Sequence, residues 1–502
     1  MVRICLCLTG RTLQQDLEFL ERYREYIDIA ELRVDCLEPD ERLLIRRFPA
    51  MAGLPVILTV RRESEGGYFK GGEGARITLL SLGMAFAEID PRMNFAYIDL
   101  EEDLNVPSLE EAARCFGTRI IRSFHNHQGL GDNLVRRIRA LQRAGDEIPK
   151  AAVSPQNLNE VLELYQAARK IEDLEKIILG MGHFGVNTRI LADKLGSCIS
   201  YASVSGDPGL PIGAPGQLNP REMAETYRFR QINKSSKIYG VTGYPLMTSS
   251  SPPLFNQVFT EEHTNAVYLP FPAESLDSFM RLAAELGIEG VSVTVPYKEK
   301  VLPYLISRSD TVIATGACNT LLRTETGWAG HNTDALGFSD SLLAFTGRQD
   351  FRKVKITIIG AGGAARAVAS ELYRLKGKVL ILNRTDVRAK RLAQSYGFDW
   401  GALDSEGLER MEHYRDIIIQ TSSLGMAPHI EGDPLPEYNF KGSETVMDLI
   451  YNPERTRFLC RAEQAGCRVL NGDDMLFRQA AHQYRLFTGG YFPAHILSRI
   501  EA

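Results

Sequence analysis

The chain has 502 residues, of which 44% are hydrophobic and 24% are charged, and its formal net charge is −5. This length accommodates roughly two to four ordinary domains, each with its own core. The small negative charge, without a lysine-rich run or a basic stripe, argues against a nucleic-acid partner.

The eight cysteines stand singly and form no zinc-binding spacing. The first residues, MVRICLCLTG, enter a strand-like run directly, without the pattern of a secretory or transit leader. No apolar run reaches the ~20 residues that a membrane-spanning helix needs. These features favour a cytoplasmic protein in a reducing compartment, with no membrane partner and no metal site.

Short apolar, β-branched runs recur through the first two hundred residues and alternate with helical patterns. Eight such alternations predict a (β/α)₈ barrel, because an open doubly wound sheet rarely needs eight units in so little chain. Chemistry in such a barrel belongs at the carboxyl ends of the strands. The expected strands are RICLCL (3–8), IAELRVD (29–35), PVILTVR (55–61), FAYIDL (95–100), TRIIRSFH (118–125), IPKAAV (148–153), KIILGMG (176–182) and CISYASV (198–204).

The ends of these expected strands are rich in ionisable groups. Glu31 and Arg33 share one face of the second strand by its period of two, and a buried strand carries charge only where the charge is paired or used. A lone lysine or histidine at such a position is usually solvated or satisfied, but seven ionisable groups at one barrel mouth predict an active site. The remaining members of the set are Arg61, Glu65, His125, Lys150 and Arg189.

These residue types suggest a division of chemical labour. Lys150 stands among apolar neighbours and faces arginines, so we expect its pKa to fall and its amine to form a Schiff base. An iminium acidifies the neighbouring carbon, which requires a general base, and His125 is the available one. Either Glu31 or Glu65 orients the imidazole, and the arginines suit an anionic substrate.

Several runs of the first half together resemble type I 3-dehydroquinate dehydratase, over residues 1 to about 230: ELRVD, TVRRESEGG, SFHN, PKAAV, MGHFGVNTR and APGQ. The resemblance implies that Lys150 forms an imine with the substrate ketone. It implies that His125 removes the C2 proton and assists loss of the C1 hydroxyl. It also implies that Arg189 holds the substrate carboxylate, while the other hydroxyls and the carbonyl are contacted by Glu31, Arg33, Arg61 and Gln217.

The loop that follows the eighth expected strand contains a departure from that family. Gly213 stands where the family usually has serine, so a contact to the substrate is either missing or supplied by the backbone. Residues 205–217, SGDPGLPIGAPGQ, are rich in glycine and proline, and we interpret them as a lid that excludes water from the site.

A polar helical segment over about 218–237 ends the barrel pattern, and a new alternating pattern starts at IYGVTG. We predict a barrel over residues 1–232, a substrate-binding domain over 237–334 and a Rossmann nucleotide-binding domain over 335–474. The helices of residues 475–502 are expected to pack back onto the substrate-binding domain.

Polar residues in the second half fall at expected helix starts. Ser249 and Ser251 precede a helical run, where their hydroxyls either hold an anion or cap the helix. In VTVPYKE a strand stops at proline and presents Lys298 at the start of the next helix, where the helix dipole disfavours a cation and a lysine usually has a purpose. The run HNTD places Asp334 on the helix that leads into the nucleotide domain.

Residues 355–385 predict a strand, a glycine turn, a helix and a second strand, which together indicate a nucleotide-binding crossover. Gly360 and Gly362 allow a tight turn and a close approach of backbone N–H groups to a pyrophosphate at the helix start, and Ala365 packs helix against strand. The other turn residues expected to contact the cofactor are Ala361, Gly363 and Ala364.

The end of the second strand bears on the choice of cofactor. It carries Asn383, Arg384 and Thr385, with Arg388 a turn later, where a cofactor without a 2′-phosphate usually meets an acid. Because arginine binds phosphate through two parallel hydrogen bonds, this end favours NADP over NAD. The alternative is that Arg384 is only a solvated charge.

The second half resembles shikimate dehydrogenase across residues 237–502, through SxSP, VTVPYKE, GACNTL, HNTD, GAGGAARA, NRT, DLIYNP and NGDDMLFRQAA. The resemblance implies that Lys298 and Asp334 form a catalytic pair close enough to share a proton, with Lys298 protonating the carbonyl as NADPH adds hydride. It implies that the substrate is held by Ser249, Ser251, Thr294, Asn319 and Gln479. The chain departs from this family at Ser292 and Gln420, where asparagine is usual.

The two halves therefore predict consecutive reactions of one bifunctional enzyme. Dehydration of 3-dehydroquinate gives 3-dehydroshikimate, which the second half reduces with NADPH to shikimate. Two alternatives remain: a quinate-preferring dehydrogenase fused to the same barrel, and a catalytically silent sensor of quinate-like ligands. The sequence leaves the oligomeric state open.

Overall fold

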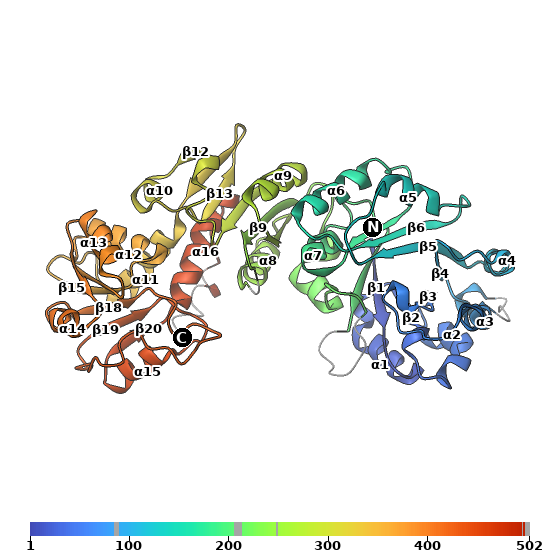
Figure 1. Ribbon diagram of the computed structural model, residues 1–502, viewed down its shortest axis with the longest axis horizontal. Helices are drawn as coiled ribbons and strands as arrows, with labels where there is room; N and C mark the ends of the chain where they lie inside the picture. The colour runs from blue at the N-terminus through green and yellow to red at the C-terminus, as the bar shows by residue number, and fades with distance from the viewer. Residues whose placement is uncertain (85–89, 205–212, 247–248, 494, 497–502) are drawn as a thin grey trace. The chain divides into compact units, whose positions relative to one another are not determined.

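The computed structural model describes residues 1–84, 90–204, 213–246, 249–493 and 495–496 (Figure 1). The chain divides into two compact units, Met1–Ile288 and Glu289–Ala502. Part of the expected lid, residues 205–212, and the last residues of the expected carboxyl-terminal helices, 497–502, lie outside the described residues.

The first unit begins with eight parallel strands in the order β7-β6-β5-β4-β3-β2-β1-β8. A parallel bridge between Lys176 and Ser197, just before β7 and β8, brings the two ends of this order together. The sheet is therefore the predicted (β/α)₈ barrel, which is confirmed. Its strands are β1 (Arg3–Leu8), β2 (Ile29–Arg33), β3 (Val56–Thr59), β4 (Tyr97–Glu101), β5 (Arg119–Asn126), β6 (Ile148–Val153), β7 (Ile177–Gly180) and β8 (Ile199–Ser203).

Helices follow the barrel strands in the expected alternation. Polar side chains begin two of them, because the Thr12 hydroxyl accepts from the Gln15 amide and the Asn157 side chain accepts from the Asn159 and Glu160 amides. The helices are α1 (Leu13–Tyr23), α2 (Phe48–Ala52), α3 (Glu73–Met84), α4 (Pro107–Cys115), α5 (Leu134–Leu141), α6 (Leu158–Arg169) and α7 (Gly182–Ile190).

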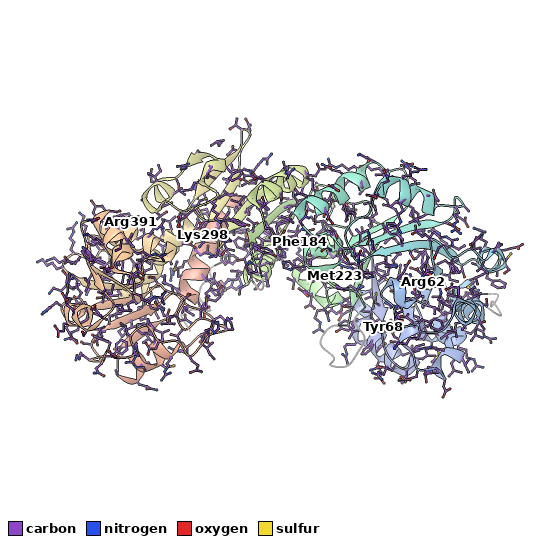
Figure 2. All side chains as sticks on the ribbon, in the orientation of Figure 1. Arg62, Tyr68, Phe184, Met223, Lys298 and Arg391 are labelled. Carbon is purple, nitrogen blue, oxygen red and sulfur yellow. The ribbon has the colours of Figure 1, made fainter. Side chains whose placement is uncertain are left out.

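The chain leaves the barrel through a short π-helical turn, Glu222–Thr226. Its Met223, labelled in Figure 2, is buried and belongs to the apolar core of the barrel. Arg228 follows and donates to the carbonyls of Phe259 and Thr264, at 2.9 and 3.2 Å. The first unit then ends with a parallel strand pair and two helices: β9 (Lys237–Gly243), α8 (Ser251–Glu261), β10 (Ala266–Pro272) and α9 (Leu276–Leu286).

The second unit contains two β-layers. In the first, β11 (Ile288–Val293) and β14 (Trp328–His331) both pair antiparallel with β13 (Thr320–Arg323), and β12 (Leu305–Arg308) runs parallel to β14. Two helices accompany this layer, α10 (Asp310–Thr315) and α11 (Thr333–Thr346).

The second layer is an all-parallel six-stranded sheet in the order β17-β16-β15-β18-β19-β20. This arrangement confirms the predicted Rossmann-like domain. The strands are β15 (Lys355–Ile359), β16 (Lys378–Asn383), β17 (Asp399–Ala402), β18 (Ile417–Gln420), β19 (Thr445–Asp448) and β20 (Arg468–Leu470), and the helices are α12 (Gly363–Arg374), α13 (Asp386–Gln394), α14 (Ser405–Met411), α15 (Arg457–Gln464) and α16 (Asp473–Thr488).

Helix α16, drawn in red in Figure 1, packs along α11. This contact brings the end of the described chain back to the helix that carries Asp334. Within the described ranges, none of the helices combines the length and the apolar character that a membrane crossing requires.

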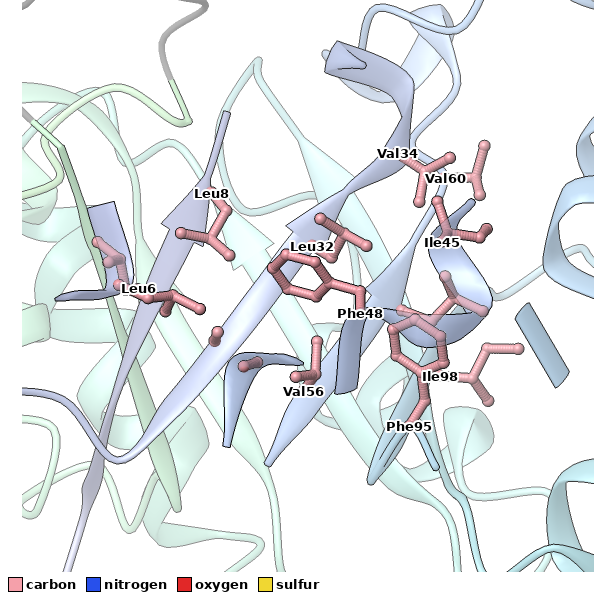
Figure 3. Packing of buried hydrophobic residues seen from close by; sticks show 14 of the residues in the cluster. Leu6, Leu8, Leu32, Val34, Ile45, Phe48, Val56, Val60, Phe95 and Ile98 are labelled. Atoms are coloured by element: carbon pink, nitrogen blue, oxygen red, sulfur yellow. The ribbon is translucent and has the colours of Figure 1, made fainter. Parts of the chain in front are cut away.

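Two apolar layers hold the barrel, and β1 contributes to both through its period of two. Leu6 and Leu8 belong to the layer between strands and helices, where they join Leu32 and Phe48 (Figure 3). Cys7 belongs instead to the layer inside the barrel. The side chains that point inward from the strand ends are therefore those available to line a site.

The outer layer allows a direct test. Phe48 is fully buried, so Phe48→Ala should lower the stability of the first unit by about 3–5 kcal/mol through lost burial and a residual cavity. Urea unfolding followed by circular dichroism reports on both units, whereas tryptophan fluorescence reports on the second unit, since Trp328 and Trp400 lie there. We expect a shifted transition in the first signal alone. Leu43→Ala, at a side chain 66% exposed, should change stability by less than about 0.5 kcal/mol.

Candidate active sites

A cavity of about 340 Å³ lies in the barrel, lined from the inward faces of the strands, from α7 and from the loops after β3 and β8. Tyr68, labelled in Figure 2, is one of its lining residues. The structure brings together every barrel residue that the sequence nominated: Glu31, Arg33, Arg61, Glu65, His125, Lys150, Arg189 and Gln217.

The Lys150 amine lies in the buried part of this cavity. Its Nζ is 2.9 Å from Asp99 Oδ2 and 3.6 Å from Glu31 Oε1, and it stands 4.3 Å from the centre of the Tyr201 ring. Burial alone would lower the pKa of Lys150, but Asp99 and Glu31 outweigh it, so the pKa lies above its ordinary value. The expected fall in pKa is therefore wrong, because the amine faces carboxylates as well as arginines.

His125 forms the second polar pair of the cavity. Its Nδ1 lies 2.7 Å from Glu65 Oε2, so of the two carboxylates considered, Glu65 orients the imidazole. Burial, followed by the charges of Arg61 and Lys150, holds the pKa of His125 well below its ordinary value. The imidazole is thus neutral at physiological pH, and an ionised Glu65 that accepts the Nδ1 proton leaves Nε2 as the basic nitrogen.

Arg189 is a buried cation that pairs with no carboxylate in the described part of the chain. Its guanidinium makes only long contacts, at 3.4 Å to the Tyr201 carbonyl and 3.5 Å to the Pro215 carbonyl, and no acceptor is found for its Nε. Burial lowers the pKa of Arg189 to about 10. A buried, incompletely satisfied cation that lines a cavity favours an anionic ligand.

The other two arginines of the set are already paired. Arg33 contacts both oxygens of Asp35, at 2.9 and 2.7 Å. Arg61 contacts Asp99 at 2.9 Å and Glu101 at 2.8 Å. Asp99 and Glu101 were not predicted as site residues from the sequence, although the period of two that selected Glu31 and Arg33 also places these two acids on one face of β4.

The second candidate site is a hydrogen-bonded cluster in the second unit. Lys298 Nζ lies 2.6 Å from Asp334 Oδ2, and Asn319 Nδ2 donates to Asp334 Oδ1 at 2.8 Å. Gln479, on α16, faces the same cluster, with its Oε1 3.3 Å from Thr333 Oγ1 and 3.5 Å from Asn319 Nδ2. The predicted pairing of Lys298 and Asp334 is present, and Figure 2 labels Lys298.

The local structure around this pair differs in part from expectation. Asp334 lies in the first turn of α11, which Asn332 caps by accepting from the Ala335 amide, so the helix start favours the carboxylate charge. Lys298 was expected at a helix start, but it lies in a run of turns between β11 and the 3₁₀ helix Leu302–Tyr304. The Lys298 carbonyl accepts from the Cys318 amide at 2.7 Å. It is therefore not engaged in a hydrogen bond within a helix.

The remaining nominated residues of the second half lie at the edges of secondary structure. Thr294 follows β11 directly and is half-buried. In the first unit, Ser251 begins α8, and its amide donates to the Ser249 hydroxyl at 3.2 Å. Ser249 thus satisfies one amide at the helix start, whereas Ser250, at the N-cap position, makes no side-chain capping hydrogen bond.

The two departures from the dehydrogenase pattern are both buried. The Ser292 hydroxyl donates to Gln483 Oε1 at 2.8 Å, so a residue of α16 meets it. Gln420 holds its own loop, because its Oε1 accepts from the Ser422 amide and its Nε2 donates to the Leu424 carbonyl, at 2.8 and 3.1 Å.

The glycine turn fits a dinucleotide. Gly360 has a φ of +111°, and a Cβ there would meet Thr421 Oγ1 at 2.6 Å. Gly362 and Gly363 are exposed at the start of α12, and a Cβ added to either would meet nothing within 4 Å, which leaves open space beside the amides of the helix start. Ala365 is fully buried where α12 meets the sheet.

The end of β16 fits the predicted phosphate group. Asn383 is half-buried and donates to the Thr385 carbonyl at 2.9 Å. Arg384 and Arg388 are exposed, and neither forms an ion pair with the residues that the structure describes. Two available guanidinium groups at this strand end suit a 2′-phosphate.

Comparisons with known proteins agree with both halves. Residues 4–234 match the family described as type I 3-dehydroquinase, residues 241–321 the shikimate dehydrogenase substrate binding domain, and residues 343–441 the family of shikimate / quinate 5-dehydrogenase.

Individual relatives cover either most of the chain or about half of it. The chloroplastic bifunctional 3-dehydroquinate dehydratase/shikimate dehydrogenase of Arabidopsis thaliana is 30% identical over 489 residues, covering 92% of this chain and 78% of the relative. The shikimate dehydrogenase (NADP(+)) of Moorella thermoacetica is 37% identical over 286 residues, covering 54% of this chain and 94% of the relative. A Listeria monocytogenes shikimate 5-dehydrogenase structure, in complex with shikimate and NAD, matches 54% of this chain and 98% of its own at 27% identity and a TM-score of 0.50.

The barrel with its buried lysine and the Rossmann-like domain with its glycine turn define a two-part enzyme, a lyase followed by an NADP-dependent dehydrogenase. The chain belongs to the family of bifunctional 3-dehydroquinate dehydratase/shikimate dehydrogenases.

The lowered pKa of His125 predicts the pH dependence of the barrel reaction. Because the imidazole stays neutral until the pH falls well below its ordinary pKa of 6.5, the acidic limb of kcat/KM for dehydration should lie below pH 6.5. Initial rates measured across the acidic and neutral range test this. A limb centred at or above pH 6.5 would show that His125 is not the neutral base.

Proposed function

We propose that the barrel dehydrates 3-dehydroquinate through an imine on Lys150, with His125 as the general base. The observation that carries this proposal is the cavity itself, which combines a buried amine, a neutral imidazole and an unpaired buried guanidinium. The amine and ketone form an imine and release water, and His125 then removes the C2 proton. The same proton assists loss of the C1 hydroxyl as water, and hydrolysis of the imine frees the product and Lys150.

The raised pKa of Lys150 adds a requirement to this sequence. An ammonium held by Asp99 and Glu31 is not a nucleophile, so the proton must leave Lys150 before the carbonyl is attacked. His125 lines the same cavity and has one ring nitrogen not engaged by Glu65, so we take it as the acceptor of this proton. The two carboxylates then stabilise the cationic iminium that replaces the ammonium.

The substrate carboxylate belongs on Arg189, whose pairing is incomplete. Arg33 and Arg61 already carry carboxylate partners, which favours a role in holding the wall of the site and in contacting neutral oxygens. Glu31 and Gln217, which line the same cavity, complete the set of proposed substrate contacts.

The second half is proposed to reduce 3-dehydroshikimate to shikimate with Lys298 and Asp334 as the catalytic pair. NADPH supplies the hydride when it is bound. Lys298 polarises the substrate carbonyl and gives a proton to the oxygen, while Asp334 keeps the amine charged and oriented at 2.6 Å. The proposed substrate contacts are Ser249, Ser251, Thr294, Asn319 and Gln479.

We propose the contacts of NADP(H) from the glycine turn and from the end of β16. The backbone of residues 360–364 would hold the pyrophosphate at the start of α12, and Arg384 and Arg388, next to Asn383 and Thr385, would pair with the 2′-phosphate.

We retain the domain limits proposed from the sequence, 1–232, 237–334 and 335–474 with 475–502 packing back. The three family matches support them, since they leave gaps near residues 235 and 334. A reducing, cytoplasm-like compartment is supported by the cysteines, all of which are free. We propose no nucleic-acid or membrane partner.

The imine predicts a covalent label. Borohydride added with 3-dehydroquinate should reduce the iminium, inactivate dehydration and add the ligand mass to the peptide that contains Lys150. Lys150→Ala should show neither the label nor dehydration while it keeps shikimate-dependent NADP reduction. Full dehydratase turnover without a label on Lys150 would refute the imine.

The proposed role of Lys298 as proton donor predicts that its removal affects the dehydrogenase reaction and leaves dehydration intact. Lys298→Ala should reduce kcat for shikimate-dependent NADP reduction by at least ~10²-fold, because general acid–base catalysis typically contributes this much. Dehydration should persist at the level of the unmodified chain. Loss of both activities would show that the halves do not act as separate sites.

Turnover of quinate measured beside shikimate in the same assay separates the remaining alternatives. A higher kcat/KM for quinate would identify a quinate-preferring dehydrogenase. Absence of both activities from folded protein would favour a ligand sensor over an enzyme.

A further inference from the structure

Cys7 lines the barrel cavity but was not among the site residues expected from the sequence. It lies near the end of β1 and is 2% exposed. Its thiol donates to Glu31 Oε2 at 3.1 Å and accepts from Gln217 Nε2 at 3.2 Å. Cys7 is thus the point where the loop after β8 meets the charged interior of the barrel.

Each partner of Cys7 has a second contact that bears on the site. The other oxygen of Glu31, Oε1, lies 3.6 Å from Lys150 Nζ and accepts from Thr59 Oγ1 at 2.9 Å. The Gln217 Oε1 accepts from the Ala214 amide at 2.9 Å. A continuous series of contacts therefore runs from the loop through Gln217, Cys7 and Glu31 to the reactive amine.

The same arrangement accounts for Gly213. A Cβ at this position would lie 2.4 Å from Gln217 Oε1 and 3.3 Å from Cys7 Cβ, so a side chain there conflicts with Gln217 where the thiol holds it. The Gly213 carbonyl meanwhile accepts from Arg33 Nη1 at 3.3 Å. The missing serine is thus replaced by a backbone contact to Arg33 and by space for Gln217.

The thiol is suited to donate a hydrogen bond. Burial, followed by the charge of Glu31, raises the pKa of the Cys7 thiol far above the physiological range. Cys7 therefore keeps its proton and remains a donor to Glu31 across the working pH of the enzyme.

We propose that Cys7 is a positioning residue of the dehydratase site, which fixes Gln217 over the cavity and Glu31 beside Lys150 through two hydrogen bonds. This inference rests on the proposed imine chemistry of Lys150. Cys7 acts through its two partners and not by contact with the reacting atoms.

Three substitutions separate hydrogen bonding from packing. Cys7→Val fills a similar volume without the hydrogen bonds, and Cys7→Ala removes both volume and hydrogen bonds, so each should lower dehydratase kcat/KM by roughly ten- to a hundred-fold through misplacement of Gln217 and Glu31. We expect a raised KM together with a lowered kcat. Cys7→Ser retains a donor and an acceptor and should recover most of the loss. Activity of Cys7→Val within about twofold of the unmodified chain would overturn the proposal.

A matched control lies two residues earlier. Cys5 is a fully buried thiol on the same face of β1, and it has no hydrogen bond in the part of the chain that the structure describes. Cys5→Val should leave dehydration within about twofold of its starting value. An equal loss in Cys5→Val and Cys7→Val would assign the effect to core packing and refute a positioning role.

A double-mutant cycle tests the route of action. If Cys7 acts through Gln217, the losses from Cys7→Val and Gln217→Ala should be less than multiplicative when combined. Gly213→Ser should also lower dehydration, since its side chain displaces Gln217. Fully multiplicative losses would contradict the route.

Borohydride labelling separates this inference from the chemistry on which it rests. At saturating 3-dehydroquinate, Cys7→Val should still be labelled on Lys150, at a reduced rate. If the unmodified chain is not labelled, the imine itself fails. Labelling of Cys7→Val at the unmodified rate would refute the positioning role alone. Shikimate-dependent NADP reduction by the same preparations reports the concentration of folded chain.

Discussion

The contact between Lys150 and Asp99 is the constraint from which the rest of the barrel interior follows. A buried ammonium is tolerable only with a carboxylate beside it, and a buried carboxylate in turn requires further donors. Asp99 meets this requirement through Arg61 and Ser123, at 2.9 and 2.5 Å. The charges at the strand ends therefore form one connected network that includes the Lys150 amine.

The second half also pairs a lysine with a carboxylate, but this pair is less buried. Asp334 gains support from the start of α11 and from Asn319, so its charge is stabilised by local dipoles and does not require a second cation. Lys298 and Asp334 keep about a third and a fifth of their side-chain surface exposed, which leaves the pair open to a substrate. In the proposed mechanism, one chain thus uses a deeply buried lysine for covalent chemistry and a more accessible lysine for proton transfer.

Much of the fold and of the two candidate sites could be predicted from the sequence, because strand periodicity and motif order are local properties. The eight barrel strands, the glycine crossover and the inward faces that carry Glu31 and Arg33 followed from such patterns. The pKa of Lys150 did not, since it depends on Asp99, which is 51 residues away along the chain. The turns around Lys298 were missed for the same reason, because the Lys298 carbonyl accepts from the amide of Cys318, which lies in the loop between α10 and β13.

The side chain of Arg228 has a consequence for dividing the enzyme. By sequence this residue belongs to the barrel, yet its guanidinium serves the carbonyls of Phe259 and Thr264, at and just beyond the end of α8. A protein cut near residue 235 would separate donor from acceptors and leave that helix end to water. The end of α8 thus depends on a side chain that precedes the predicted start of the dehydrogenase half.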